Sequence, residues 1–430
     1  AALTRRGVAC QPFKTGPDFI DPGLHELACG RQSHNLDSWM LPAEANRAIL
    51  ARHAFGADAA VIEGAMGLFD GAGGTSERGS AAHLAKLLGV PALLVADASG
   101  MGRSAAALAQ GFARFDPELR LAGVVFNRVG GPGHREILGE AMAQAGLPVL
   151  GMLPRDESLA VPPRHLGLTT AQDLDAGEGW AARLADWVES GIALDALLDA
   201  LPGLVVQPPP GEPAPEAYVR LGVARDRAFC FTYAENLRLL EAAGARLVFF
   251  SPVGDARLPE NLDGLYLPGG YPELNASELA ANASMLADIR AFCASGRPVY
   301  AECGGFMALM RAFHGQDGRI RQMAGVFPCT ARMGERFAAL GYREARMLLE
   351  TPLGPAGTLA RGHEFHYSFL DALPDVPAAY ALSGRKGPLG TPEGFLSGNT
   401  LGSYVHLHFA SNPDLARNFV ASMARQATAQ

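Results

Sequence analysis

The chain has 430 residues, of which 48% are hydrophobic and 19% are charged, and it carries a formal net charge of −8 at pH 7. This length predicts two or three domains, and the negative charge argues against nucleic acid as the main partner. No apolar run reaches the ~18–20 residues of a membrane span, and no targeting segment is visible. Six scattered cysteines, without metal-ligand spacing or a disulfide framework, favour a cytoplasmic protein.

Apolar strands alternate with amphipathic helical stretches through the first part of the chain. Strands are expected at 8–13, 59–63, 92–96, 121–126 and 149–152, and helices at 43–55, 80–88, 104–115 and 135–145. Near-continuous apolar strands separated by helices are typical of a parallel sheet that is covered by helices on both faces. Ligands of such sheets bind outside the carboxyl ends of the strands.

Acidic side chains follow two of these expected strands. Lys14, Asp18 and Asp21 come after the first strand, and Glu63 and Asp70 come after the second. We therefore expect Asp18, Glu63 and Asp70 to converge and hold Mg²⁺ through oxygen ligands, with nucleotide phosphates completing the shell and Lys14 offsetting their charge. Each acid alone is equally well explained as a solvated loop carboxylate or a helix cap. Their combination with a scarce lysine favours the joint site.

Proline-rich residues 201–216 divide the chain, because such a stretch forms neither a helix nor a central strand. We expect a first domain at 1–200, a linker at 201–216 and a second domain at 217–430. Strands of the second domain are expected at 220–224, 246–250, 264–267 and 299–301. The predicted fold class is α/β, with two doubly wound domains in tandem.

Cys303 stands where a short apolar strand turns through two glycines into a helix. This pattern is typical of a nucleophile elbow, here with sulfur in place of a hydroxyl, and the helix N-terminus is expected to favour the thiolate. A thiol nucleophile also needs a base, which His406 or His408 near the C-terminus would supply. The alternative is a buried structural cysteine. The strand before Cys303 and the glycines after it favour the catalytic interpretation.

Five motifs, in this order, resemble those of the cobyrinic acid a,c-diamide synthase family, which includes the hydrogenobyrinic acid a,c-diamide synthases. They are KTGPDFIDP at 14–22, EGAMGLFDG at 63–71, LPGGYPE at 267–273, ECGG at 302–305 and SYVHLHF at 403–409, and they span nearly the whole chain. The resemblance implies an ATP-dependent, dethiobiotin-synthetase-like domain of the P-loop NTPase type, followed by a class I glutamine amidotransferase domain. It implies a ligase of cobalamin biosynthesis that amidates the a and c acetates of hydrogenobyrinic or cobyrinic acid with glutamine and ATP.

The resemblance also implies roles for single residues. In the amidotransferase domain, Cys303 is the nucleophile and His406 its base, and the backbone N–H groups at Gly269, Gly270 and Gly304 are candidates for the oxyanion hole. Class I amidotransferases usually carry a glutamate two residues after this histidine. Here that position is His408, so a Cys–His dyad is favoured over a triad.

In the synthetase domain, the resemblance maps Asp18 and Glu63 to Mg²⁺ and nucleotide handling, in a site that includes Lys14 and Asp21. Phe19, Ile20 and Asp70 map near the corrin substrate or its phosphorylated intermediate. Phe19 stands where tyrosine is more usual, so any role for a hydroxyl there is lost. Asn127 lies where related ATPases recognise adenine, although an ordinary strand-end cap explains it almost equally well.

Two other functions are compatible with these motifs. One is the cobyric acid synthase branch, which amidates four other corrin side chains; the motif at 403–409 and the short linker favour the a,c-diamide branch. The other is a non-catalytic amidotransferase-like binding protein, against which the Cys303–His406 pair argues. The sequence does not tell whether the corrinoid carries cobalt, and it leaves a homo-oligomer open.

A phosphate loop of the Gly-Lys-Thr kind is missing from the printed residues, since lysine occurs only at positions 14, 86 and 386. Residues 1–7 read as the end of a helix that leads into the first expected strand. We therefore expect that an earlier strand and its phosphate loop are absent from this sequence. The expected consequences are little or no ATP binding, an exposed strand edge in the first domain and a glutaminase domain that still folds. An N-terminal extension of family length is expected to recover ATP-dependent amidation.

Overall fold

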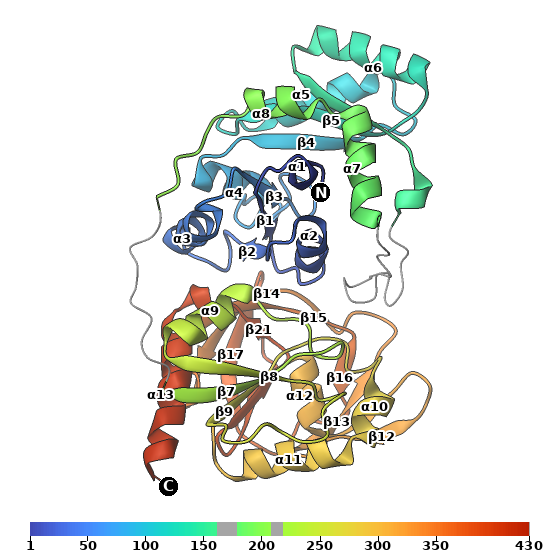
Figure 1. The fold of residues 1–430 in the computed structure, drawn as a ribbon. Helices are drawn as coiled ribbons and strands as arrows, with labels where there is room; N and C mark the ends of the chain where they lie inside the picture. The colour runs from blue at the N-terminus through green and yellow to red at the C-terminus, as the bar shows by residue number, and fades with distance from the viewer. Residues whose placement is uncertain (161–178, 208–217, 430) are drawn as a thin grey trace. The chain divides into compact units, whose positions relative to one another are not determined.

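The computed structural model describes residues 1–160, 179–207 and 218–429 (Figure 1). The chain forms two compact units, one of residues 1–39 and 43–209 and the other of residues 40–42 and 210–430. Residues 208–216 of the expected linker lie outside the described residues. Within the described part of the chain, no helix combines the length and the apolar character that a membrane crossing needs.

The first unit contains two three-stranded parallel sheets. In one, β1 (Cys10–Thr15) lies between β2 (His34–Leu36) and β3 (Ala59–Glu63); in the other, β5 (Leu121–Val129) lies between β4 (Ala92–Asp97) and β6 (Val149–Pro154). The helices are α1 (Ala2–Arg5), α2 (Asp21–Cys29), α3 (Ala43–Ala54), α4 (Ala81–Leu88), α5 (Ser104–Phe115), α6 (Pro132–Ala145), α7 (Trp180–Gly191) and α8 (Leu194–Ala200), with a short 3₁₀ turn η1 (Glu157–Leu159). The expected strands and helices are present, although β1 begins and ends two residues later than predicted.

Strand β3 forms one edge of its sheet and strand β4 one edge of the other, and among the described residues each pairs with one neighbour. Apolar side chains on both strands are exposed: Val61 of β3 to 48% and Val95 of β4 to 61%. Central strands of an α/β sheet are normally buried on both faces. Val61 and Val95 therefore depart from the burial that is usual for a central strand.

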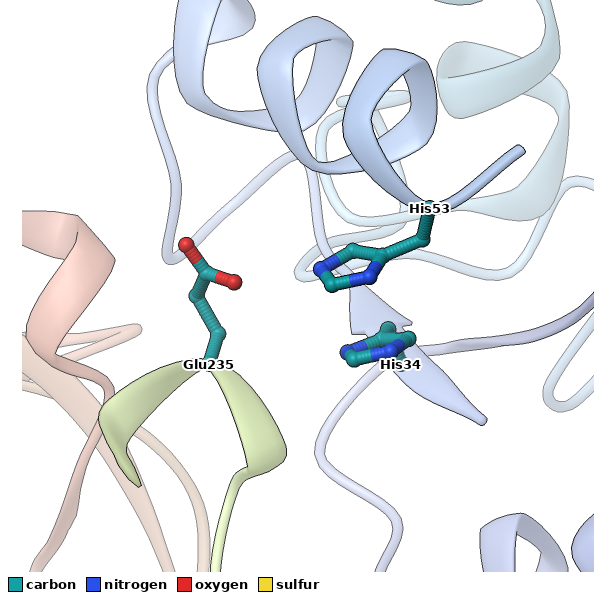
Figure 2. Close-up of side chains that lie close together, drawn as sticks. All are labelled: His34, His53 and Glu235. Atoms are coloured by element: carbon teal, nitrogen blue, oxygen red, sulfur yellow. The ribbon is translucent and has the colours of Figure 1, made fainter. Parts of the chain in front are cut away.

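Two stacked histidine rings connect α3 to β2. His34 of β2 and His53 of α3 lie with ring centroids 3.4 Å apart and planes 16° from parallel (Figure 2). Glu235, also drawn in Figure 2, belongs to helix α9 (Ala234–Ala242) of the second unit, where Arg238 contacts its carboxylate at 2.8 Å. Packing of α3 on β2 holds that strand beside β1, which places Asn35 opposite Lys14.

The second unit is organised around five parallel strands. They are β7 (Val219–Ala224), β8 (Ala245–Phe250), β9 (Gly264–Leu267), β10 (Val299–Glu302) and β20 (Thr400–Ser403), in the spatial order β20-β10-β9-β7-β8. Its other helices are α10 (Ala276–Ala281), α11 (Ala283–Ala294), α12 (Gly304–Leu309) and α13 (Asp414–Ala429), with a 3₁₀ turn η2 (Phe409–Ser411). The parallel order confirms the predicted α/β architecture.

Antiparallel strands make up much of the remainder of this unit and were not predicted from the sequence. Strands β14 (Ala339–Met347), β15 (Leu359–His366), β17 (Ala378–Gly384), β19 (Glu393–Ser397) and β21 (His406–Leu407) extend the same sheet beyond β20, with β18 (Gly387–Pro388) paired to β17. A separate sheet contains β11 (Met310–His314), β12 (Ile320–Gln322), β13 (Phe327–Met333) and β16 (Ser368–Leu370). Several of these strands are only two to five residues long, so their alternation is too brief to identify them from sequence.

Strand β10 lies between the two apolar clusters of the second unit. Ala301 and Cys303 belong to the cluster that contains Phe306, whereas Tyr300 belongs to the cluster that contains Phe419. Because successive side chains of a strand point to opposite faces, β10 is packed on both sides. The turn that follows β10 is therefore held at the centre of the unit.

The closest backbone approach near this turn is at Gly305 of α12. A Cβ atom there would lie 2.0 Å from the carbonyl oxygen of Leu267 in β9, a contact that no rotamer change can relieve. We predict that Gly305→Ala destabilises the second unit by ~1–3 kcal/mol, the usual cost of overpacking. Gly390→Ala is the control, because nothing lies within 4 Å of its Cβ position. Urea unfolding with peptide-resolved hydrogen exchange measures both, and equal stability of the two variants would contradict this packing.

Candidate active sites

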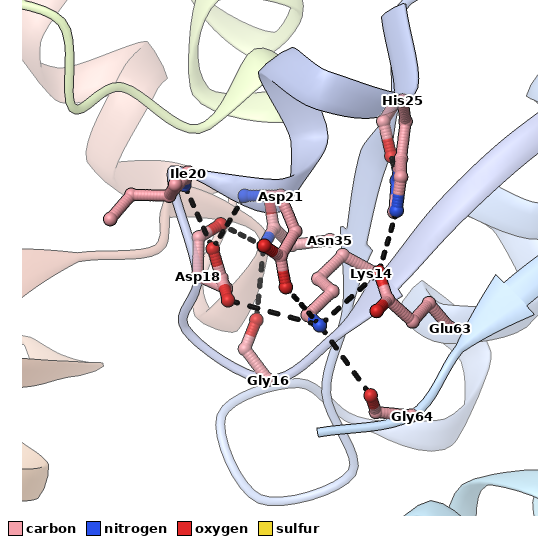
Figure 3. Close-up of polar contacts among 10 residues, drawn as sticks. Lys14, Gly16, Asp18, Ile20, Asp21, His25, Asn35, Glu63 and Gly64 are labelled. Atoms are coloured by element: carbon pink, nitrogen blue, oxygen red, sulfur yellow. Dashed lines mark hydrogen bonds and ion pairs between the residues drawn. The ribbon is translucent and has the colours of Figure 1, made fainter. Parts of the chain in front are cut away.

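The first candidate site surrounds the ammonium group of Lys14, whose side chain is only 4% exposed (Figure 3). Its Nζ lies 2.5 Å from Asp21, 3.3 Å from Glu63 and 3.9 Å from Asp18. The carbonyl oxygen of Gly64 accepts a further hydrogen bond from Nζ at 3.4 Å. One buried lysine therefore faces three carboxylates, so the cluster keeps an excess of negative charge.

The register of the first sheet explains this convergence. Lys14 near the end of β1 pairs with Glu63 at the end of β3 and with Asn35 of β2. The loop after β1 is tied by Asn35, whose Nδ2 donates to the carbonyl oxygens of Gly16 at 3.0 Å and Asp18 at 2.7 Å. Four of the predicted synthetase-site residues are thus brought together at the carboxyl ends of neighbouring parallel strands.

The two carboxylates predicted to bind a metal differ in environment. Burial and the nearby charge of Asp21 raise the pKa of Asp18, although its Oδ1 accepts amide hydrogen bonds from Ile20 at 2.8 Å and Asp21 at 3.0 Å. Burial would also raise the pKa of Glu63, but the hydrogen bond with His25 and the charge of Lys14 outweigh it and lower that pKa. Glu63 is therefore held as a carboxylate, and Asp18 keeps Oδ2 directed towards the lysine.

The remaining residues predicted for this domain lie in the loop after β3, at the start of α2 and within β5. Asp70 is exposed, and its Oδ2 accepts a hydrogen bond from the amide of Gly67 at 3.0 Å within its own loop. Phe19 and Ile20 are half-buried at the start of α2. Asn127 lies within β5 rather than after it, and its Oδ1 accepts from the amide of Arg128 at 2.7 Å. That contact is local, between two residues adjacent in the chain.

The second candidate site is built on Cys303, which is 7% exposed and has φ 44° and ψ −102°. These dihedrals are strained for a residue with a Cβ atom, and such strain is concentrated at functional sites. Strand β10 ends directly before Cys303, and α12 begins directly after it. The Cys303 amide donates to the carbonyl oxygen of Ser403 in β20 at 2.7 Å. The strand-to-helix elbow predicted from the sequence is present.

The protonation expected for this cysteine is corrected by its surroundings. Burial raises the pKa of the Cys303 thiol, the nearby carboxylate of Glu273 raises it further, and the Gly304 amide only partly opposes them. Helix α12 is six residues long, so its dipole is small. The resting side chain is a thiol rather than the expected thiolate, and it needs a base to remove its proton.

Glycines allow His406 and the elbow to approach one loop. A Cβ atom on Gly269 would lie 2.2 Å from Cε1 of His406, and one on Gly304 would lie 3.1 Å from the amide nitrogen of Gly270. Gly270 has φ 157° and packs against the backbone of Ala228. Loop 269–270 therefore lies against both the turn at Cys303 and the ring of His406, and the amide nitrogen of Gly270 lies beside the elbow.

His406 is almost fully buried and is held by a strand that was not predicted. β20 ends at Ser403, and His406 itself lies in β21, opposite His363 of β15. The rings of His406 and His363 stack with centroids 4.9 Å apart. Burial lowers the pKa of His406 to about 3, and His366 adds to this effect. The imidazole is therefore neutral near pH 7 and able to accept a proton.

His408 occupies a different environment from His406. Its ring packs on Tyr233 with centroids 4.3 Å apart, and its Nδ1 accepts a hydrogen bond from the amide of Ala410 at 3.3 Å. Burial lowers its pKa to about 4. These contacts are with α9 and η2 neighbours, whereas His406 contacts the glycine loop beside Cys303.

Two polar residues of these sites were not identified from the sequence. His25 of α2 holds Glu63, with Nε2 2.6 Å from Oε2, and its Nδ1 lies 3.0 Å from the hydroxyl of Ser33. Its spacing of four residues from Asp21 places both on one helix face, a signal that the sequence contains. Glu302 is a buried carboxylate at the end of an apolar strand, directly before the nucleophile. A charged residue in that position was a second available signal.

Two family descriptions match the chain, one over each unit. The CobB/CobQ-like glutamine amidotransferase domain matches residues 220–414, and the CobQ/CobB/MinD/ParA nucleotide binding domain matches residues 1–167. The second match supports nucleotide binding by the first unit. Together the matches agree with the α/β sheets described above.

Relatives of known function match nearly the whole chain. The cobyrinate a,c-diamide synthase of Syntrophotalea carbinolica is 46% identical over 430 residues, which cover 98% of this chain and 93% of that protein. The hydrogenobyrinate a,c-diamide synthase of Streptomyces coelicolor is 41% identical, with 98% and 92% covered, and that of Mesorhizobium japonicum is 42% identical, with 94% and 92% covered. A chain of the PurLQS structure from Thermotoga maritima is 16% identical over 48% of this chain and 98% of its own length, with a TM-score of 0.35.

The relatives' identity and coverage, and the domain matches, agree with the motifs read from the sequence. The chain belongs to the cobyrinate and hydrogenobyrinate a,c-diamide synthase family, the glutamine-dependent amido-ligases of cobalamin biosynthesis.

Proposed function

We propose that this protein amidates the a and c acetate carboxylates of a corrin precursor, using ATP and ammonia taken from glutamine. The observation that carries the proposal is the strained Cys303 elbow with the neutral His406 on the same glycine loop. The lysine–carboxylate cluster of the first unit supports the ATP-dependent half of the reaction.

In the glutaminase half, His406 removes the thiol proton as Cys303 attacks the side-chain amide of glutamine. The C–N bond then breaks, and the same imidazole returns the proton to the leaving ammonia. Backbone N–H groups at Gly269, Gly270 and Gly304 are proposed to stabilise the negative oxygen of the tetrahedral intermediate. Water hydrolyses the thioester to glutamate and regenerates the thiol.

In the synthetase half, a corrin carboxylate attacks the γ-phosphoryl group of ATP, displaces ADP and forms an acyl phosphate. Ammonia then attacks the acyl carbon and yields the amide with loss of phosphate. Activation is required because a carboxylate is a poor electrophile. Lys14 stabilises the charge of the transferred group, and Asp21 orients the lysine through their 2.5 Å contact. Phe19, Ile20 and Asp70 are proposed to line the corrin or the intermediate, and Asn127 the adenine.

The donor set of the first site fits Mg²⁺. Asp18 and Glu63 offer hard carboxylate oxygens, and the cluster carries more negative than positive charge. We propose these two residues as its ligands. When bound, Mg²⁺ supplies positive charge next to the nucleotide phosphates.

The corrin substrate is hydrogenobyrinic or cobyrinic acid, since relatives with both names are similarly related to this chain. The other synthesis considered, that of cobyric acid, uses the same two half-reactions on four other side chains. Incubation with each of the two acids, and mass measurement of the product, distinguishes the substrates and counts the amides formed.

Replacement of the thiol separates the two halves of the reaction. We predict that Cys303→Ser lowers glutamine hydrolysis by at least ~10³-fold, because a serine hydroxyl is a much weaker nucleophile than a cysteine thiol. Amidation with added ammonia should be largely unchanged, because it does not use the thiol. A variant that hydrolyses glutamine at the normal rate would show that Cys303 is not the nucleophile.

The two histidines are distinguished by separate substitutions. His406→Ala is expected to reduce glutamine hydrolysis to background, whereas His408→Ala should only weaken it, because His408 packs on Tyr233 rather than on the glycine loop. Initial-rate measurements on both variants give the answer. Loss confined to His408→Ala would reverse the assignment of the base, and equal complete loss in both would remove its positional support.

The acids of the first unit are tested by metal binding. Asp18→Asn and Glu63→Gln keep size and remove a charge, so each should weaken Mn²⁺ binding, measured by electron paramagnetic resonance, and Mg²⁺–ATP use by about tenfold or more. Glutamine hydrolysis should be retained. Glu44→Gln, an exposed acid in the first turn of α3, controls for net charge. Unchanged metal affinity in both site variants would exclude these residues as ligands.

A further inference from the structure

Glu302, the residue directly before the nucleophile, has no role in the mechanism above, yet it lies in the centre of the second unit. Its side chain is 1% exposed. Oε1 accepts hydrogen bonds from the hydroxyl of Tyr300 at 2.5 Å and the amide of Leu407 at 2.9 Å, and Oε2 accepts from the hydroxyl of Tyr266 at 2.8 Å. All three partners donate, so the site is built for a carboxylate.

The same carboxylate reaches the catalytic histidine in two ways. Leu407, whose amide binds Oε1, is the residue after His406, so Glu302 fixes the backbone of β21 next to that ring. Oε2 lies 4.0 Å from Nδ1 of His406. One side chain on the nucleophile's strand therefore positions both the backbone and the ring of the base.

We propose that Glu302 is the carboxylate that orients His406 and stabilises its protonated form, so that the glutaminase has a Cys303–His406–Glu302 triad. The expected dyad rested on His408 standing where glutamate is usual, two residues after the base. Here the carboxylate comes from the opposite direction along the chain, at the end of β10. This assignment rests on the proposed function. In it, Glu302 is a positioning residue that acts through His406.

The chemistry of the imidazole requires such a partner. When His406 takes the thiol proton it becomes a cation in an almost fully buried place, and burial already lowers its pKa to about 3. A carboxylate at Nδ1 keeps the proton of the neutral ring on Nδ1, and it leaves Nε2 to accept the thiol proton of Cys303. Burial raises the pKa of Glu302 to about 7, while its three hydrogen bonds favour the ionised form.

The 4.0 Å separation exceeds a hydrogen bond, so the pair is open in the resting protein. The resting pKa of His406 is set by burial, by His366 and by Glu364. A shift of the ring by about 1 Å would form the Nδ1–H to Oε2 bond, and catalytic hydrogen bonds commonly tighten when substrate binds.

A second buried glutamate of the same sheet provides a matched control. Glu393 accepts hydrogen bonds from the hydroxyl of Ser403 at 2.7 Å and from the amide of Tyr404 at 2.6 Å, and burial raises its pKa to about 7 as well. It therefore resembles Glu302 in burial, in accepting hydrogen bonds and in its raised pKa. These two hydrogen bonds are with Ser403 and Tyr404, rather than with His406 or its neighbour Leu407.

Kinetics of glutamine hydrolysis by the full chain provide the test. Glu302→Gln should lower kcat about 100-fold and change KM less than about threefold, because the lost interaction acts mainly in the transition state. Glu302→Asp, which keeps the charge, should recover part of kcat. Glu393→Gln should lower kcat less than about threefold. Equal losses for Glu302→Gln and Glu393→Gln, or unchanged kcat in Glu302→Gln, would overturn the proposal.

Alkylation of Cys303 by iodoacetamide, followed peptide by peptide, gives a readout without turnover. Glu302→Gln should slow alkylation at pH 7 about tenfold when His406 is present and have no further effect in His406→Ala, because the carboxylate acts through the imidazole. Equal slowing in both backgrounds would indicate a structural role and overturn the proposal.

Cys303→Ser distinguishes failure of this inference from failure of the proposed function. If Cys303→Ser still hydrolyses glutamine, the proposed function is wrong. If Cys303→Ser is inactive and Glu302→Gln hydrolyses glutamine at the normal rate, only this inference is removed.

Discussion

The backbone conformation of Cys303 is the constraint on which the second unit depends. A non-glycine residue with φ 44° and ψ −102° carries a backbone strain of ~1–3 kcal/mol, so surrounding contacts must impose this conformation. β10 pairs with β9 on one side and with β20 on the other, and the Cys303 amide donates a hydrogen bond to the carbonyl oxygen of Ser403. Because Gly305 has no side chain, α12 packs closely against β9. The strain is maintained by β10 and α12, whose residues are all buried, and it places Cys303 next to the glycine loop.

The two units compensate buried charge in different ways. In the first, three carboxylates surround a single lysine, which leaves an excess of negative charge that suits a cation. In the second, the buried carboxylate of Glu302 is surrounded by hydroxyl and amide donors, with a neutral imidazole at 4.0 Å. An isolated buried charge is costly, so each arrangement needs a partner when its charge changes. A metal with phosphates would be that partner in the first unit, and the protonated His406 in the second.

Much of the fold could be predicted because parallel strands and their helices leave strong local patterns. The strands at 59–63 and 264–267 and the helix at 104–115 were placed at their observed bounds, and the elbow at Cys303 followed from an apolar run, a cysteine and two glycines. The antiparallel extension was missed because several of its strands are short and others, such as β14, alternate only weakly. Strand register determines contacts that the sequence pattern does not reveal. β15 places His363 against His406, and the pairing of β1 with β3 places Glu63 beside Lys14. The thiolate was expected from the helix alone, whereas burial, a tertiary effect, determines the pKa of Cys303.

Transfer of labelled nitrogen tests the central claim most directly. The protein, carrying the N-terminal extension expected to recover ATP-dependent amidation, would be supplied with glutamine labelled with ¹⁵N in its side-chain amide. ATP, Mg²⁺, unlabelled ammonium at low concentration and hydrogenobyrinic or cobyrinic acid would be added. We expect a corrin product that carries two ¹⁵N amides, at the a and c positions, as detected by mass spectrometry and NMR. Label at four other side chains, or the release of labelled ammonia with no labelled corrin, would contradict it.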